Sequence, residues 1–460
     1  MLPDIFQAFI NESPVSVMVR GLLERFLNPA QLDEWFEQTA QAQYTRELLF
    51  SSVFSLMTEV VCGVRPSLNR AYDARAEEVP VSLTSVYNKV NGIETQTSAA
   101  LVRYSAAQAQ KVIEELGAQR EPVLAGYPVR ILDGNCLAAS EKRLKPLRGE
   151  RAAALPGKSV VVYDPALGLI LNTYPCENGH AQERSVLSAV LDQVQAGEVW
   201  IGDRNFCTRG FLQGLDQRGA FFIIRKHENL PWVPLEGVHA CGRIDTGQVY
   251  EQAIEVVDDN GQRHTWRRIC VELDEPTRNG DQEIYILTNL PVEEVDACRI
   301  AEAYRNRWCI ETAFQHLEQN FNAEINTLGY PRAALFGFSV ALVAYNVFAV
   351  VLAALRSAHP DKDIDASVSS YALAEELGST YRGMMIALPA PQWQCFQTLS
   401  VVALVMLLQD LAGRIRLSSF SKKRRGPKKP VTKKPYNRKR PHVSTQKQLL
   451  AAAATKNSSP

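Results

Sequence analysis

The chain has 460 residues, of which 46% are hydrophobic and 22% are charged, and these values are ordinary for a globular protein of about three domains. Its formal net charge is zero. Its nine cysteines are odd in number and scattered without a Cys-x-x-Cys spacing, which argues against a disulfide framework or a zinc site and favours a reduced, cytoplasmic setting.

The first 125 residues have the apolar spacing of helices and lack an export signal. Within them, VPVSLTSVYNKVNGIETQTSAALV predicts a pair of short helices: Ser82 or Thr84 can cap the first, and Gly92 can end it. A helix-turn-helix that reads DNA and a plain helical bundle both fit this pattern.

From Tyr127 onward the pattern changes to short strands, namely PVRILDGN, KSVVVYDPALG, GLILNTYPCENG, VWIGDRNF and AFFIIRKH. Short connections join the first three strands, and helices at ERSVLSAVLDQVQ and TRGFLQGLDQRG separate the later ones. Three consecutive strands followed by β-α-β-α-β is the order of a ribonuclease-H-like core, so the fold class is α/β.

Residues 228–292 alternate around turn signals such as DDNG and predict a β-rich insertion. A helical segment follows from 293. Residues 333–355 carry no charge and are long enough to span a bilayer. Since nothing else supports a membrane topology, we expect a buried core helix there, followed by further helices to about Leu417.

The end of the chain is strongly basic. No acidic residue follows Asp410, whereas residues 422–447 hold twelve of the fifty lysines and arginines. The rest of the chain then has 38 basic and 50 acidic residues, and this asymmetry points to a polyanion partner, most simply DNA. So many like charges and prolines predict a disordered tail over 418–460; the candidate DNA contacts at its start are Lys422, Lys423, Arg424 and Arg425.

Three carboxylates are candidates for catalysis. Asp133 ends the first predicted strand and Asp203 the fourth; these strands are neighbours in the proposed order, so the two acids would meet. Glu311 would join them from a predicted helix. Tyr304, Arg307 and Glu318 lie on the same side of that helix as Glu311. An adjacent apolar stripe consists of Trp308, Phe314, Leu317 and Phe321. The structural alternatives are turn-capping aspartates and a simple Arg307–Glu311 ion pair.

Three converging carboxylates repel one another unless cations neutralise them. Oxygen ligands of this kind favour Mg²⁺ or Mn²⁺, and two such ions about 4 Å apart activate a hydroxyl nucleophile at a phosphorus. The predicted reaction is therefore phosphodiester hydrolysis and transesterification. Tyr304 and Arg307 could hold a phosphate.

The ordered set of DGN at Asp133, GDRNF at Asp203 and Tyr-x2-Arg-x3-Glu ending at Glu311 resembles the bacterial insertion-sequence DDE transposases. The group it resembles carries a Tyr-Arg-Glu-Lys signature and a β-rich insertion before the catalytic Glu (the "IS-four" family). The likeness covers residues 125 to 355, about half of the chain.

The resemblance implies Mg²⁺-dependent cut-and-paste transposition: cleavage at the terminal inverted repeats, through a hairpin or directly, and strand transfer into target DNA. It makes Asp133, Asp203 and Glu311 the metal ligands and Tyr304 and Arg307 phosphate contacts. It also implies a homodimer in the synaptic complex, with no membrane, in the bacterial cytoplasm near the nucleoid.

One departure favours a different reading. The lysine that such proteins carry seven residues after the Glu is replaced here by Glu318, and a carboxylate cannot replace a cationic phosphate contact. A decayed or domesticated transposase that binds DNA without cleaving it therefore remains the alternative.

Several other residues have two readings. Arg204, Arg225 and Lys226 are candidate DNA contacts. For His180 and Glu183, which open a predicted helix, capping is favoured over metal binding. For Trp232 and Trp266, packing is favoured over stacking on a flipped base.

These assignments predict six regions along the chain. They are a helical N-terminal DNA-binding domain (1–125), the first part of the core (126–227), the β-rich insertion (228–292), the second part of the core with the catalytic Glu helix (293–357), a helical C-terminal region (358–417) and the basic tail (418–460).

Overall fold

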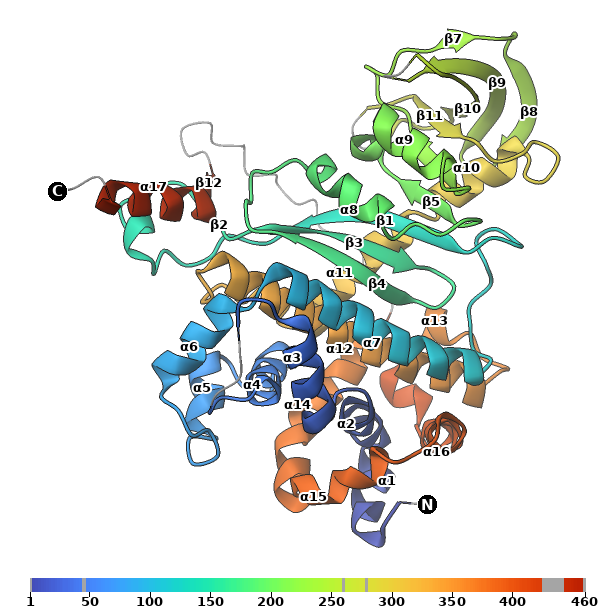
Figure 1. Cartoon of the computed structure of the whole chain (residues 1–460). Helices are drawn as coiled ribbons and strands as arrows, with labels where there is room; N and C mark the ends of the chain where they lie inside the picture. Colours follow the sequence, from blue (N-terminus) through green and yellow to red (C-terminus); the bar gives the residue numbers. More distant parts are fainter. Residues whose placement is uncertain (1, 44–46, 259–260, 278–279, 424–441, 458–460) are drawn as a thin grey trace.

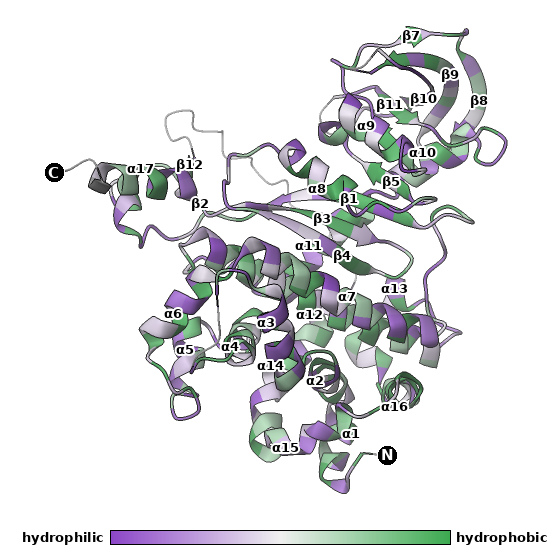
Figure 2. Cartoon of the chain, in the orientation of Figure 1, coloured by the Kyte–Doolittle hydropathy of each residue, from purple (hydrophilic) through white to green (hydrophobic). Residues whose placement is uncertain are grey.

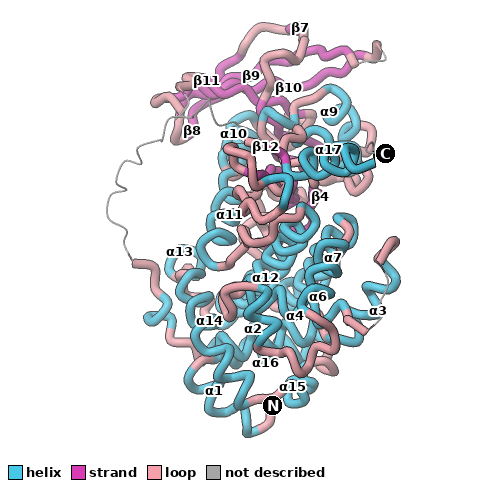
Figure 3. Tube along the Cα trace, turned by 90° about the vertical axis from the view of Figure 1, so that its left-hand side faces the viewer, coloured by secondary structure: helices cyan, strands magenta, loops and turns pink. Residues whose placement is uncertain are grey.

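The computed structural model describes residues 2–43, 47–258, 261–277, 280–423 and 442–457. A long twisted sheet crosses the molecule, with a thick layer of helices beneath one part of it and a curved group of strands at its far end (Figure 1). Viewed from the side, the helical layer and the strands of the insertion lie at opposite ends (Figure 3).

Five strands form the core of this sheet. Their order is β4 (Leu169–Cys176), β3 (Lys158–Asp164), β1 (Val129–Cys136), β5 (Val199–Gly202) and β6 (Phe221–Arg225). β1 runs antiparallel to β3 and parallel to β5, which is itself parallel to β6. The predicted strand order and the predicted contact between the first and fourth strands are confirmed.

The sheet is buried on both faces, and successive residues of β1 face opposite sides. Ile131 packs into the large core shared with the helical layer, whereas Leu132 packs into a second core. That second core lies beneath α8 (Leu187–Leu191) and α9 (Arg209–Asp216). The helix predicted over 183–195 is shorter than expected, because a 3-10 turn at Glu183–Val186 precedes α8.

The strands predicted within 228–292 are present. They are β7 (Val233–Pro234), β8 (His239–Ile244), β9 (Gly247–Val257), β10 (Arg263–Leu273) and β11 (Glu283–Thr288). They do not form a separate sheet, because β11 pairs antiparallel with β6 and continues the core sheet outward. The insertion is therefore held to the core by backbone hydrogen bonds as well as by packing.

Seven helices precede the sheet in the described part of the chain. They are α1 (Gln7–Glu12), α2 (Pro14–Phe26), α3 (Pro29–Thr39), α4 (Phe50–Val61), α5 (Leu68–Asp73), α6 (Leu83–Gly92) and α7 (Thr95–Glu115). Ser82 caps α6 as predicted, its hydroxyl accepting from the Ser85 amide at 3.2 Å.

The helix pair α6–α7 is not a DNA-reading helix-turn-helix. The second helix of such a motif must be free to enter a groove of DNA. Here α7 lies against β4 and α12 beneath the sheet (Figure 1), and Leu101, Val102 and Ala109 on it are buried. The helical-bundle reading of the sequence is the correct one.

The uncharged segment forms α12 (Pro331–Ala358), which runs through the middle of the helical layer. By length and composition it could cross a membrane, as could the bent pair Ala390–Phe396 and Val401–Gly413 if it were a single span. However, 89% of the most apolar window of α12 is buried within the protein, so the prediction of a buried core helix is confirmed. In Figure 2 the helical layer is largely apolar around this helix.

The C-terminal helices share the core of the N-terminal ones. They are α13 (Ile364–Ser367), α14 (Ser370–Ala387), α15 (Ala390–Trp393) and α16 (Val401–Gly413). Trp393 meets Phe6 edge-on with ring centroids 5.0 Å apart, and both belong to the core that also holds Ile131 of the sheet. Segments far apart in sequence thus form one helical layer.

The end of the chain is not wholly a disordered tail. Val443–Ser444 form β12, which pairs in parallel with β2 (Ala154–Leu155), and Thr445–Asn457 form α17. The physical reason is composition: the Gln, Leu and Ala residues of QKQLLAAAA favour a helix. Residues 424–441 lie outside the described residues, so the prediction for them stands as made.

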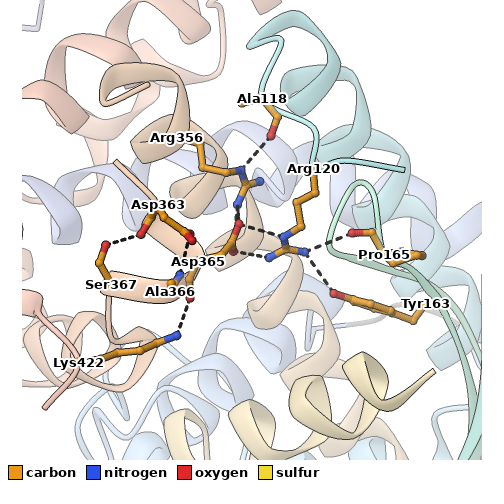
Figure 4. A network of polar contacts seen from close by, with 10 residues as sticks. All are labelled: Ala118, Arg120, Tyr163, Pro165, Arg356, Asp363, Asp365, Ala366, Ser367 and Lys422. Atoms are coloured by element: carbon orange, nitrogen blue, oxygen red, sulfur yellow. Dashed lines mark hydrogen bonds and ion pairs between the residues drawn. The ribbon is translucent and has the colours of Figure 1, made fainter. Parts of the chain in front are cut away.

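An ionic network joins the sheet to the helical layer and to the start of the basic segment (Figure 4). Asp365 accepts hydrogen bonds from Arg120 Nη2 at 2.8 Å and from Arg356 Nη1 at 3.3 Å. Arg120 also donates to the Tyr163 hydroxyl at 3.2 Å. Lys422 Nζ donates to the Asp365 carbonyl at 2.5 Å, which holds this part of the chain against α13.

A buried amide joins α12 to the edge strand of the core. Asn346 is fully buried; its Oδ1 accepts from the Ile170 amide and its Nδ2 donates to the Ile170 carbonyl, both at 2.9 Å. Because β4 is an edge strand, these backbone groups have no further strand to pair with. The side chain of Asn346 replaces the missing strand.

We therefore predict that Asn346→Leu lowers the free energy of unfolding by about 2–4 kcal/mol, because it leaves two buried backbone groups unpaired. Denaturant unfolding measures this change. Ser339→Ala on the same helix is the matched control, since the buried Ser339 hydroxyl has no hydrogen-bond partner among the described residues. A loss no larger than that of the control would contradict the role given to Asn346.

The ionic network predicts a dependence of stability on pH. Burial by itself would raise the pKa of Asp365. The hydrogen bond from Arg120 and the positive charges of Arg120, Arg356 and Lys422 outweigh this effect, so the pKa lies below its usual value. A carboxyl whose pKa is depressed by folding stabilises the protein above its unfolded pKa, and this stabilisation is lost as the pH falls through its folded pKa. Asp365→Asn should therefore lower the melting temperature at pH 7 more than at pH 3. Calorimetry checks this, with exposed Asp361→Asn as the control.

Candidate active site

The segment that carries Glu311 is two helices, not one. α10 (Ala297–Arg305) ends at Asn306, and α11 (Trp308–Asn320) begins after Arg307. At the break, the Arg307 amide bonds to the Tyr304 carbonyl at 3.0 Å, three residues back, which tightens the turn. The prediction of one continuous helix is therefore wrong, although Tyr304, Arg307 and Glu311 still line one cleft.

The predicted apolar stripe of this segment is also only partly present. Leu317 and Phe321 are buried, but Trp308 is 57% exposed. The turn at Arg307 places Trp308 at the start of α11, where it lines a cleft instead of packing in the core. Glu318 is exposed on the same helix.

Asp133 and Asp203 follow matched positions on neighbouring strands. Leu132 of β1 pairs with Gly202 of β5, so each aspartate comes one residue after a paired position. Asp133 lies two residues after Ile131, and Asp203 lies two residues after Ile201; both isoleucines belong to the large core. Because side chains alternate between the two faces of a strand, both aspartates point toward the face that the large core covers. Their carboxylates accept from nearby backbone amides, Gly134 at 2.9 Å and Asn205 at 2.8 Å.

One arginine connects the candidate acids. Arg307 Nη1 donates to Asp133 Oδ2 at 3.0 Å, and Arg307 Nη2 donates to Glu311 Oε1 at 3.2 Å. The Arg307 side chain is 9% exposed and that of Asp133 is 16% exposed. The Arg307–Glu311 ion pair considered as the structural alternative is present, but it is part of a larger group that also includes Asp133.

The electrostatics of this group agree with three acids that face one another. Burial raises the pKa of Asp133 to about 6; Arg307 and the Gly134 amide oppose the rise, and the charges of Asp203 and Glu311 add to it. Burial lowers the pKa of Arg307, but Asp133, Tyr304, Glu311 and Asp203 outweigh this effect and raise it. The carboxylates at 133, 203 and 311 therefore act on one another and on a shared guanidinium.

The chemistry of these donors fits a divalent cation, because carboxylate oxygens are the ligands that Mg²⁺ and Mn²⁺ prefer. Their present positions do not yet form such a site. No group of three or more His, Cys, Asp or Glu side chains in the described part of the chain could hold a metal ion. Arg307 instead neutralises Asp133 and Glu311.

A cleft of about 820 Å³ opens beside the acids, between the β-rich insertion and the helices α10 and α11. Asp203, Glu311, Tyr304 and Arg307 line it. The structure thus brings together the two phosphate candidates Tyr304 and Arg307 and two of the three acids on one concave surface.

The arginine and lysine residues of the core that are candidate DNA contacts line the same region. Arg204 and Arg225 line the 820 Å³ cleft and also an adjoining one of about 460 Å³, which Lys226 lines as well. Arg204 is exposed, whereas Arg225 pairs with Asp281 at 2.9 Å. Burial lowers the pKa of Lys226. These three side chains lie where a polyanion in the cleft would meet them.

The candidate cations of the basic segment lie elsewhere. Lys422 is part of the Asp365 network, and it lines a different cavity, on which Cys309 and His316 of α11 also lie. Lys423 is exposed. Arg424 and Arg425 lie outside the described residues, and their role as DNA contacts stays a prediction.

The two tryptophans of the insertion differ. Trp266 is 3% exposed and meets Phe222 edge-on at 5.2 Å, so packing is confirmed for it. Trp232 is partly exposed. The Arg268 guanidinium lies 4.8 Å from its ring centroid and the Lys226 ammonium 5.9 Å from it, which are cation–π contacts.

Glu183, for which the sequence favoured helix capping over metal binding, lies near the two aspartates. Glu183 Oε2 accepts from Asn205 Nδ2 at 3.2 Å, two residues after Asp203. A Cβ at Gly134 would lie 2.3 Å from Glu183 Oε1, so a larger residue beside Asp133 would require the Glu183 side chain to move. Capping by Glu183 is not observed, because the turn that it opens has no side-chain cap. The Gly of DGN was the signal for this close approach; His180 is exposed.

Residues 124–347 match the family model described as "Transposase DDE domain". The matched segment includes all three candidate acids. Among solved structures, the chain resembles the cryo-EM structure of the piggyBac transposase synaptic complex with hairpin DNA, at 11% identity and a TM-score of 0.40, over 91% of this chain and 88% of that one. No curated protein matches the sequence. The part of the chain that holds the candidate acids is thus similar to a transposase DDE domain.

Proposed function

We propose that this protein is a DNA transposase that performs Mg²⁺-dependent cut-and-paste transposition of an insertion sequence. The observation that carries the proposal is that Asp133 and Glu311 share the guanidinium of Arg307, while Asp203 lines the same cleft as Arg307 and Glu311. The family match over these residues supports it. We further propose that β4-β3-β1-β5-β6 is a ribonuclease-H-like core and that the chain belongs to the Tyr-Arg-Glu-Lys group.

In this proposal Asp133, Asp203 and Glu311 hold Mg²⁺, for which Mn²⁺ can substitute. When bound, the ions activate the attacking hydroxyl and stabilise the leaving oxyanion at one phosphorus. Arg204, Arg225 and Lys226 contact phosphates along the clefts that they line, and Tyr304 and Arg307 contact the phosphate next to the acids.

The reaction consists of two kinds of step. Hydrolysis at a transposon end breaks a phosphodiester bond and frees a 3′-hydroxyl. That hydroxyl then attacks target DNA, so one P–O bond forms as another breaks. An intermediate hairpin on the transposon end would use the same acids twice. We propose that the protein acts on terminal inverted repeats as a homodimer, in the bacterial cytoplasm.

Asp203→Ala should abolish strand cleavage at Mg²⁺ concentrations that support full cleavage by the unchanged protein, while DNA affinity in Ca²⁺ stays nearly the same. Nicking of DNA that carries the terminal repeats measures the activity. Asp274→Asn is the matched control, since this exposed acid at the rim pairs with Arg243 and not with the acid group. If the unchanged protein binds the repeats but never nicks them in Mg²⁺ or Mn²⁺, the non-cleaving alternative suggested by Glu318 is the better function.

Arg204→Ala should weaken DNA binding similarly for all sequences and reduce the slope of log affinity against log salt by about 0.9, the value for one phosphate contact. Fluorescence anisotropy at several salt concentrations measures this slope. Arg414→Ala, which removes an exposed arginine just after the end of α16 in the helical layer, should leave the slope unchanged. Equal slopes for the two variants would exclude Arg204 from the interface.

A further inference from the structure

Arg307 is held among the acids by charge rather than by a complete set of hydrogen bonds. Two of its nitrogens donate to Asp133 and Glu311, but its buried Nε has no hydrogen-bond partner among the described residues. A buried donor without an acceptor is destabilising. The guanidinium keeps this position because it neutralises carboxylates that would otherwise repel one another.

A divalent cation at the proposed site and this guanidinium would both be attracted to the carboxylates of Asp133 and Glu311, one oxygen of each of which accepts from Arg307. A doubly charged ion interacts more strongly with the acids than a singly charged one at similar distance, and it repels the nearby guanidinium. Binding of the ion therefore favours movement of Arg307 away from the acids.

The structure offers Arg307 a place to go. Arg307 lies at the break between α10 and α11, outside both helices. It lines the 820 Å³ cleft. On that side its guanidinium already lies 5.1 Å from the ring centroid of Trp308, an exposed aromatic side chain of the same cleft. Movement toward the cleft would bring its donors to where a phosphate binds in the proposed function.

We propose that Arg307 is an exchangeable internal counter-ion: it holds Asp133 and Glu311 together in the metal-free protein and is displaced into the cleft when a divalent cation binds. The inference rests on the proposed metal site but adds a positioning role for Arg307 before any DNA is present. The metal must compete with Arg307, so the arginine lowers metal affinity while it stabilises the metal-free protein.

The test measures metal binding without DNA. Calorimetric titration of the full chain with Mn²⁺ should give about tenfold tighter binding for Arg307→Ala than for the unchanged protein, within the usual range of coupling between two ligands. The metal-free Arg307→Ala protein should melt at a lower temperature, and Mn²⁺ should raise its melting temperature by more. Arg307→Lys should fall between the two proteins, because one ammonium cannot bridge both acids as the guanidinium does.

Arg305→Ala is the matched control. It removes the same charge from the same cleft, but Arg305 is half-exposed and pairs with Asp245 at 3.2 Å. Its Mn²⁺ affinity should stay within about twofold of the unchanged protein, since screening weakens exposed charges. Tighter binding in both variants would assign the effect to general charge and overturn the counter-ion role.

Two further outcomes would overturn the inference, and they separate it from the proposed function. Equal or weaker Mn²⁺ binding by Arg307→Ala would mean that Arg307 does not compete, while the metal site itself would stand. If Mn²⁺ binds neither protein, the metal site fails and the counter-ion role fails with it. Tryptophan fluorescence gives a second readout: Mg²⁺ should change it in the unchanged protein, and most of this change should be absent in Trp308→Phe.

Discussion

The structure of this protein depends on one electrostatic constraint: carboxylates from distant parts of the chain act on one nearly buried guanidinium, that of Arg307. Asp133 comes from β1, Asp203 follows β5 and Glu311 lies on α11. Like charges at short range in a poorly solvated site are strongly unfavourable unless a cation lies between them. Here Arg307 supplies that positive charge through hydrogen bonds to Asp133 and Glu311.

The rest of the fold fixes the positions of these acids. Parallel pairing of β1 with β5 places Asp133 beside Asp203, and burial of the sheet on both faces keeps the strands in register. The helical layer, which includes α12 and its Asn346 bond to the edge strand, covers one face. Because β11 continues the sheet from β6, the insertion forms the far wall of the cleft beside the acids.

Where the sequence-based predictions were wrong, the causes were packing between distant elements for α7 and local composition for the end of the chain. The helical spacing around Arg307 favoured one helix, yet the structure has a turn there, and Trp308 is consequently exposed. The pair α6–α7 had the length and caps of a DNA reader, but α7 is covered by β4 and α12. The high mean charge of the basic tail predicted disorder for all of it, but the composition of its last residues favours a helix, which they form.

The sequence alone predicted most of the strands and helices and all of the candidate acids. It shows the apolar runs that end in Asp133 and Asp203 and the four-residue spacing from Arg307 to Glu311. These features can be predicted because strand burial and helix periodicity depend on neighbouring residues. The meeting of these acids, the guanidinium between them and the approach of Glu183 to Gly134 depend on how separate elements pack. Those contacts join residues of separate elements that lie tens to well over a hundred positions apart in the chain, or they arise at a turn, and sequence periodicity carries no information about either.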